Sequence, residues 1–139
     1  MQIKQVDTIF QKYVDQLTRL HELCFPSDDM PDFKKGYWWI AYDGSEPVGF
    51  CGLTHVASWD SAGYLNRGGM IRTHRGKGMQ RRMINVRVNK ARKVGWSWLI
   101  SATRENIPSS NNLIACGFKL YNPNYEWLDG HSLYWIKKI

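Results

Sequence analysis

A glycine-containing segment at residues 70–80 carries the clearest chemical signal in this sequence. It reads MIRTHRGKGMQ, in which Gly76 and Gly78 flank Lys77. The segment follows an expected strand and precedes an expected helix, so its glycines permit a tight turn with free backbone N–H groups. A helix N-terminus with free amides and a positive dipole end binds anions, phosphate above all. Because the longer pattern of a Walker loop is absent, the spacing predicts a phosphate-binding turn of another kind.

Basic side chains surround this segment. Between Tyr64 and Arg104 there is no Asp or Glu, and the whole chain carries a formal net charge of +7. Such a field attracts polyanions. The phosphates of a bound cofactor account for part of the excess, and the remainder is either a solvated helix face or a nucleic-acid footprint. The residues of that second interpretation are Arg81, Arg82, Arg87, Lys90, Arg92 and Lys93.

Alternating strands and helices are expected to position the loop. The apolar pattern predicts strands at 2–6, 37–42, 48–56, 64–71 and 96–103, and a last hairpin over 119–127 and 131–139. It predicts helices at 8–24, 79–94 and 106–116. Thr8 is expected to cap the first helix, and Gly95 to end the second. Gly68 and Gly69 predict a bulge or a close backbone approach by a ligand. Strand, loop, helix and strand over 64–103 predict a βαβ unit with two parallel strands.

Length and composition favour one domain over residues 1–139. No segment approaches the roughly 20 apolar residues that span a bilayer, and the N-terminus lacks a signal-peptide core, so we expect a cytoplasmic protein without a membrane partner. Cys24, Cys51 and Cys116 are odd in number and widely spaced, which favours buried, inert thiols, with Cys116 the exception nearest the expected site.

The order of these elements and two motifs resemble the GNAT superfamily of acetyl-CoA-dependent N-acyltransferases. The motifs are the Arg-Gly-x-Gly loop and the block NIPSSNNLIACGF at 106–118, and the hairpin over 40–50 agrees with the central antiparallel pair of that family. The resemblance implies an α/β fold with a mixed central sheet of six or seven strands, a splayed parallel pair and three to four flanking helices. It also implies transfer of an acetyl group from acetyl-CoA to a primary amine by direct attack in a ternary complex.

The resemblance assigns cofactor-binding residues. It implies that the backbone of Met70, Ile71 and Arg72 pairs with the pantetheine arm, and that Asn106 and Ser109 also contact the cosubstrate. The pyrophosphate is assigned to the loop residues Arg75, Gly76, Lys77, Gly78, Met79 and Gln80. This chain departs from the family twice: Gln80 stands where Gly or Ala is usual, and Leu113 stands where a tyrosine often protonates the departing thiolate.

Catalytic residues are harder to assign. The usual base positions of the family carry Tyr64 and Asn66, which are not effective bases near neutral pH. His55 is the favoured base because a histidine titrates near neutrality, and Asp60 is the alternative. For the acid, Tyr121 lies just beyond the Gly-Phe pair, with Ser109 as the alternative. The other histidines show no metal-ligand spacing, so no metal is expected.

The acceptor and the partners stay open at this level. An amine-bearing small molecule, a protein lysine and a protein N-terminus all fit, and the acidic group Asp28, Asp29 and Asp32 would favour a cationic acceptor if it lies beside the acceptor groove. Two alternatives are a catalytically degenerate acyl-CoA-binding protein and, less favoured, a nucleic-acid-associated one. An exposed Trp127 would suit a homodimer interface.

Overall fold

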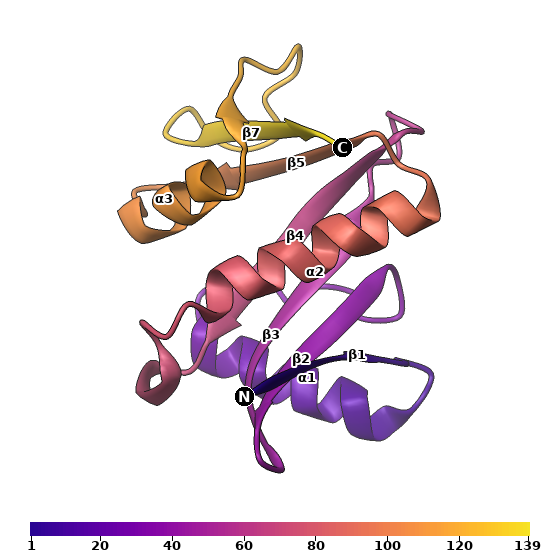
Figure 1. Cartoon of the computed structure of the whole chain (residues 1–139), viewed down its shortest axis with the longest axis vertical. Coiled ribbons are helices and arrows are strands. Elements are labelled where there is room, and N and C mark those ends of the chain that lie inside the picture. The colour runs from indigo at the N-terminus through magenta and orange to yellow at the C-terminus, as the bar shows by residue number, and fades with distance from the viewer.

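A seven-stranded mixed sheet forms the centre of the computed structural model, which describes all of residues 1–139 (Figure 1). Its strands are β1 (Gln2–Val6), β2 (Tyr37–Asp43), β3 (Glu46–His55), β4 (Ala62–Met70), β5 (Trp98–Thr103), β6 (Lys119–Leu120) and β7 (Leu133–Lys138). Their order in the sheet is β1-β2-β3-β4-β5-β7-β6, and only β4 and β5 run parallel. The expected mixed sheet with one parallel pair is therefore confirmed.

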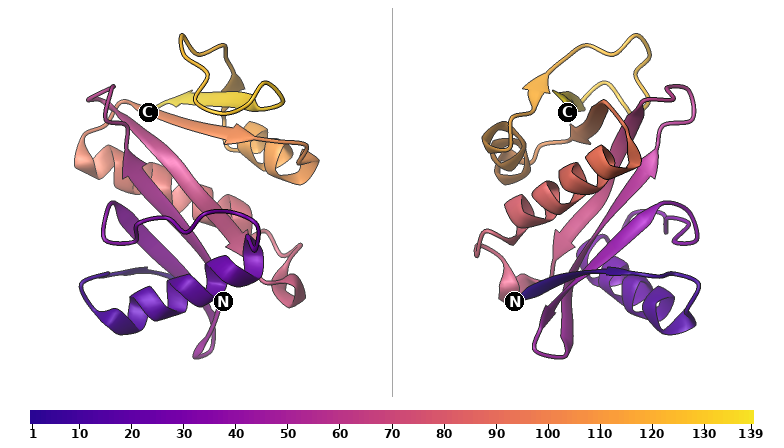
Figure 2. Two further views of the ribbon diagram at one scale, coloured as in Figure 1. Left: turned by 180° about the vertical axis from the view of Figure 1, so that it is seen from behind. Right: turned by 45° about the vertical axis from the view of Figure 1, so that its right-hand side comes forward.

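Helices cover both faces of this sheet, as the two views in Figure 2 show. Helix α1 (Gln11–Cys24) packs on one face, while α2 (Met79–Val94) and α3 (Ile107–Ala115) pack on the other, and a short 3-10 helix, η1 (Arg72–His74), precedes α2. Alternation along the strands separates the two cores, since Phe50 points toward α1 and Leu53 toward α2. Three α-helices thus flank the sheet, within the expected range.

The parallel strands stay together for a short distance only. They pair at Ala62–Trp98, Gly63–Leu99 and Tyr64–Ile100, and the rest of β4 has no strand neighbour on that side. Just beyond this point the register of β4 against β3 shifts by one residue, and Arg67 adopts a positive φ of 61°. The bulge therefore lies at Arg67, one residue before the predicted glycines, and it marks where the strands diverge.

Gly69 lies where helix α1 comes close to the sheet. A Cβ atom at this position would lie 2.9 Å from the Cβ of Cys24 at the end of α1. Helix α1 therefore makes a close approach at Gly69, and the approach of a ligand there stays a prediction. Only glycine lets the helix lie this near the strand.

Two boundaries differ from the sequence-based prediction. Helix α1 begins at Gln11 with Phe10 as its N-cap, because the Asp7 carboxylate accepts the N–H of Ile9 in a preceding turn and Thr8 caps nothing. The last hairpin is shorter than expected, since β6 ends at Leu120 and a loop fills residues 121–132. No helix is both long and apolar enough to cross a membrane.

Candidate active site

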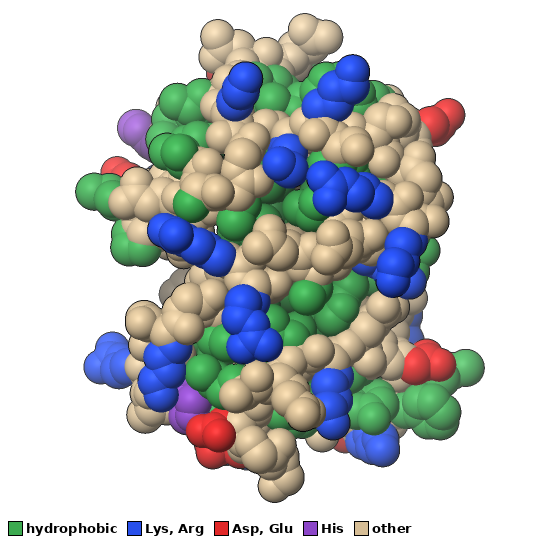
Figure 3. All heavy atoms as spheres, viewed as in Figure 1, with side chains coloured by type: hydrophobic (Ala, Val, Ile, Leu, Met, Phe, Trp, Pro, Cys, Tyr) green, Lys and Arg blue, Asp and Glu red, His purple; other side chains and the backbone are tan.

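The divergence of β4 and β5 leaves a cleft between them. Its outer part encloses about 650 Å³ and its inner part about 300 Å³, and the two share six lining residues. These shared residues are Phe25, Gly68, Gln80, Asn106, Ser109 and Asn112. In Figure 3 the surface is hollowed between α3 and the loop before α2, and lysine and arginine side chains are spread over this face. The cleft can therefore take an extended, anionic molecule.

The loop before α2 closes the outer end of the cleft. Gly76 and Gly78 have φ values of 76° and 74°, a left-handed conformation that favours glycine, and Gly78 is the N-cap of the helix. The backbone N–H groups of Met79, Gln80 and Arg81 donate to no acceptor in the protein. Since these amides open the helix at its positive dipole end, the outer cleft can bind phosphate.

Polar contacts hold this loop in place. The Arg75 Nε–H donates to the Met70 carbonyl oxygen at 3.0 Å. His74 Nε2 lies 2.8 Å from the carboxylate of Asp43 at the end of β2, and this hydrogen bond is the main cause that lowers the pKa of Asp43. The loop is thus tied to the ends of two strands before any ligand binds.

Helix α3 supplies the opposite wall. Asn106 is its N-cap, and its side-chain oxygen accepts the N–H of Ser109 at 3.0 Å, which leaves the Asn106 amide nitrogen available. The end of β5 is fixed beneath it, because Thr103 Oγ1 accepts the indole N–H of Trp135 at 2.9 Å and lies 3.0 Å from the Ser110 hydroxyl. Hydrogen-bonding groups from α2 and α3 therefore face each other across the cleft.

Most residues assigned to the cofactor by resemblance line this cleft. They are Met70, Arg75, Gly76, Gly78, Met79, Gln80, Asn106 and Ser109. Ile71, Arg72 and Lys77 lie outside its lining. The Ile71 N–H donates to the Val48 carbonyl oxygen at 2.8 Å, so it belongs to the β3–β4 pairing. At the cleft, the backbone carbonyls of Gly68 and Met70 accept the side-chain donors of Gln80 and Arg75.

Gln80 lies where the outer and inner parts of the cleft meet. Its side-chain amide donates to the Gly68 carbonyl oxygen at 3.1 Å, across the space between α2 and β4. An extended ligand that passes from the loop to the inner cleft must run beside this side chain or displace it. The departure from the small residue of the family thus has a definite structural consequence.

A second cavity of about 860 Å³ opens on the face of the sheet opposite α2 and α3. No charged side chain lines it, and nine of its fifteen lining residues are hydrophobic. The aromatic ones are Trp59, Tyr64, Tyr121, Tyr125 and Trp127, and His55 is also present. Tyr64 lines both this aromatic cavity and the inner cleft. It therefore marks the place where the two spaces adjoin.

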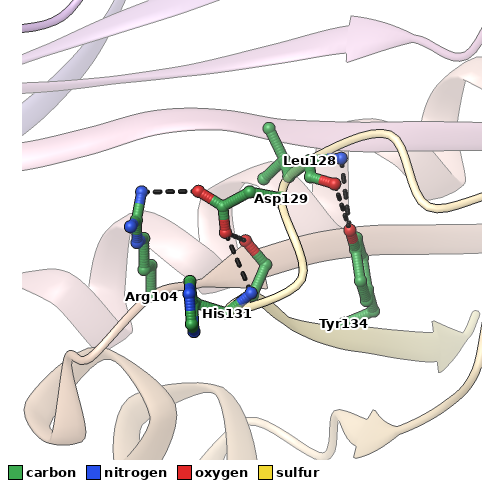
Figure 4. Close-up of polar contacts among 6 residues, drawn as sticks. Arg104, Leu128, Asp129, His131 and Tyr134 are labelled. Atoms are coloured by element: carbon green, nitrogen blue, oxygen red, sulfur yellow. Dashed lines mark hydrogen bonds and ion pairs between the residues drawn. The ribbon is translucent and has the colours of Figure 1, made fainter.

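The loop between β6 and β7 covers the aromatic cavity and is anchored at two points (Figure 4). The Asp129 carboxylate pairs with Arg104 beyond the end of β5, and it also accepts the N–H of His131 at 3.0 Å. The Tyr134 hydroxyl accepts the Leu128 N–H at 3.1 Å and donates to the Leu128 carbonyl oxygen at 3.2 Å. These contacts give an otherwise irregular loop a fixed position.

The catalytic candidates lie in the aromatic cavity. His55 Nε2 is 2.9 Å from the Asp60 carbonyl oxygen, so this nitrogen carries the proton and Nδ1 is the free acceptor. The His55 ring stacks on Trp96 with centroids 5.3 Å apart. Burial raises the pKa of Tyr121 to about 12, with Tyr134 adding to the effect, so its hydroxyl keeps its proton. Neither His55 nor Tyr121 lines the cleft itself.

Several sequence-based interpretations need correction. Arg87 is not part of an exposed basic face, because it is only 3% exposed and points into the core. Trp127 is half-buried, and its ring packs against that of Tyr134 with the ring centroids 4.5 Å apart. This packing removes the argument for a dimer interface there. The thiol beside the cleft is that of Cys24 and not that of Cys116, and burial raises the pKa of both.

The three acidic residues do not converge on one groove. Asp28 lines the inner cleft, Asp32 lines a separate hollow near Tyr37, and the Asp29 carbonyl oxygen accepts from Arg67 at 3.1 Å. None of them lines the aromatic cavity. Sequence reasoning also gave no part to Phe25, which lines both parts of the cleft. Its position after the helix-ending Cys24 was the only signal.

Comparisons with known proteins agree with this geometry. A Bacillus subtilis acetyltransferase in complex with CoA matches with a TM-score of 0.79 and 17% identity, covering 99% of this chain and 98% of that one. An acetyltransferase from Streptococcus agalactiae matches with a TM-score of 0.76 and 20% identity, covering 99% of this chain and 98% of that one. The aminoglycoside 6'-N-acetyltransferase from Enterococcus faecium matches with a TM-score of 0.77 and 16% identity, covering 99% of this chain and 97% of that one. No curated protein sequence matches significantly.

These likenesses at low identity concern the fold, and the sequence itself gives the family. The profile of the Acetyltransferase (GNAT) family matches residues 6–118, from the last residue of β1 to the residue after the helix-ending glycine. The match includes the loop at 75–80, the diverging strands and helix α3. The chain therefore belongs to the GNAT family of acetyltransferases.

Proposed function

We propose that this chain, taken as one domain over residues 1–139, transfers an acetyl group from acetyl-CoA to a primary amine. One observation supports this above the others: the cleft runs from the free amides of α2 past Gly68 to Tyr64, where the aromatic cavity adjoins it. An acyl donor anchored by its phosphates at the helix thus extends toward an acceptor held on the other side of the sheet. The amine nitrogen attacks the thioester carbonyl carbon, and the carbon–sulfur bond breaks.

The fit of the donor rests on residues of this chain. The amides of Met79, Gln80 and Arg81 are free, and the loop adds the positive charge of Arg75. Such a site holds a pyrophosphate, and the amide groups of a pantetheine arm find hydrogen-bonding partners at Met70 and Asn106. The CoA in the Bacillus subtilis neighbour is consistent with this assignment.

The acceptor, in this proposal, is a primary amine on an apolar or aromatic body. The aromatic cavity has no carboxylate to pair with a polycation, so highly charged amines gain little there. Aromatic rings attract an ammonium group through their faces, and an apolar surrounding then lowers its pKa, which raises the fraction of the neutral nucleophile. Both effects favour an amine whose remaining atoms are hydrophobic.

His55 and Tyr121 keep their proposed roles in this arrangement. His55 Nδ1 has a free lone pair at the edge of the cavity and takes the proton of the amine, directly or through water, with Asp60 holding the opposite nitrogen through its carbonyl. Tyr121, whose pKa is raised by burial, holds a hydroxyl proton at neutral pH and is the proposed acid for the departing thiolate, with Ser109 in the cleft as the alternative.

Calorimetric titration with acetyl-CoA tests the donor site. Gly78→Glu introduces a side chain and a negative charge at the N-cap of α2, and it should abolish saturable binding. Gly95→Glu is the matched control, because Gly95 also has a positive φ, 97°, with open space around it, but it ends the same helix. Wild-type protein that folds but does not bind acetyl-CoA would refute the proposal.

Release of CoA thiol then tests the acceptor class. A primary amine with an aromatic body should give a higher kcat/KM than a polyamine of similar length. Binding of acetyl-CoA without thiol release for any amine would instead favour the catalytically degenerate alternative. A preference for the polyamine would contradict the assignment of the aromatic cavity to the acceptor.

A further inference from the structure

Arg87 is the one cationic side chain buried in the core, at 3% exposure. It lies on α2 between Met83 and Ala91, which are both buried, so the helix directs it at the sheet. No carboxylate lies within ion-pair distance of it, and burial lowers the pKa of its guanidinium. An arginine stays charged in spite of such a shift, and an uncompensated buried charge is costly unless something uses it.

Backbone carbonyls hold part of the guanidinium. Nε donates to the Met83 carbonyl oxygen at 3.0 Å, and Nη1 donates to those of Gly52 at 3.2 Å and Arg67 at 2.8 Å. The last two acceptors belong to the bulge, where the shifted register leaves carbonyls without strand partners. These contacts orient the guanidinium plane, but they do not neutralise its charge.

Nη2 makes none of these bonds and points to the cleft. It lies against Gly68, where a Cβ atom would approach it to 3.3 Å. Every fully buried side-chain nitrogen and oxygen in the protein has a hydrogen-bond partner. Because Nη2 has none, it must reach the accessible surface. That surface belongs to the inner cleft, which Arg87 lines. A cationic donor thus faces the inner space beside Leu113, which has no proton to give.

We propose that Arg87 is a catalytic residue whose guanidinium binds the sulfur of CoA as it leaves as a thiolate. The inference rests on the function proposed above. When the amine nitrogen bonds to the carbonyl carbon, the sulfur departs with the electron pair of the broken bond, and the amine proton passes to His55 or to water. Arg87 keeps its own proton and stabilises the anion by a charge-assisted hydrogen bond. The thiolate then takes a proton from the proposed acid, Tyr121 or Ser109, which solvent protonates again, or it takes a proton directly from solvent.

The thiol of bound CoA reports on this directly, without an acceptor. Its pKa is read from the ultraviolet absorbance of the thiolate during a pH titration, with the complex of the sulfur-free analogue subtracted to remove tyrosine ionisation. Bound to the wild type, the thiol should titrate at least about one unit below a free thiol, near 8.5, which is a tenfold stabilisation of the thiolate. A bound thiol with an unchanged or raised pKa overturns the proposal.

Variants separate charge from structure. Arg87→Gln should return the thiol toward its free pKa, and Arg87→Lys should retain part of the shift because it keeps the charge. Arg92→Gln removes an exposed cation from the same helix and should leave the thiol shifted. If the Arg87 variants fail to fold, the wild-type titration still decides. Failure of CoA to bind refutes the donor site, whereas bound CoA with an unshifted thiol refutes only the role of Arg87.

Discussion

Removal of the Gln80 side chain should tighten the binding of CoA. The amide of Gln80 donates to the Gly68 carbonyl oxygen at 3.1 Å and spans the cleft at the junction of its two parts. We expect a pantetheine arm to displace this contact instead of running beside it, and a net hydrogen bond of this kind contributes about 0.5–1.5 kcal/mol. Gln80→Ala abolishes that cost, so the dissociation constant should fall by about twofold to thirteenfold.

The assay is calorimetric titration with CoA, compared with Asn89→Ala as a control. Asn89 is an exposed residue of the same helix and does not line the cleft, so its replacement should leave the dissociation constant unchanged. Weaker binding by Gln80→Ala would refute the reasoning, because it would mean that the amide contacts the ligand instead of obstructing it. An unchanged constant would mean that the side chain moves aside without cost.

Three further predictions concern other parts of the site. Burial, with a contribution from Arg67, lowers the pKa of His21 below 6.5. The free energy of unfolding should therefore keep its full value above pH 6.5 and fall as the pH drops toward the folded-state pKa of His21, by at most about 1.4 kcal/mol per pH unit. Urea unfolding should show a weaker pH dependence for His21→Phe. His55→Ala should lower kcat by about a hundredfold or more at neutral pH with CoA affinity unchanged, and an unaltered kcat would exclude it as the base. Tyr134→Phe removes both hydrogen bonds to Leu128 and should destabilise the fold by about 1–3 kcal/mol, read from the unfolding midpoint.

The elements around the loop could be predicted because their signals are local. Gly76 and Gly78 need a left-handed backbone, Gly95 ends a helix, and Asn106 with Pro108 opens one, so each residue type indicates its own conformation. The parallel pairing of β4 and β5 follows from the helix between them. These features depend on neighbours in sequence, which a single chain displays.

The features that failed depend on contacts between distant segments. The loop at 121–132 reads as strand by composition, yet its position depends on the ion pair of Asp129 with Arg104, which lies far from it in sequence, and on the hydrogen bonds of Leu128 with Tyr134. The burial of Arg87 did have a signal, since Met83, Arg87 and Ala91 are spaced at four residues on one helix face. Charge counting along the sequence hid this spacing. Composition identified the cations, but only periodicity could separate the buried one.

The bulge at Arg67 joins the two faces of the site through one residue. Its side chain extends toward α1, where Nε donates to His21 Nε2 at 3.1 Å, while its carbonyl oxygen accepts from Arg87 on the opposite face. The left-handed backbone of a non-glycine residue costs on the order of 1–2 kcal/mol, so it persists only because contacts on both sides hold it. The same bulge lies where β4 and β5 part and where Gly68 begins to line the cleft. A change on the α1 face, such as protonation of His21, should therefore alter the position of Gly68 and the affinity for CoA.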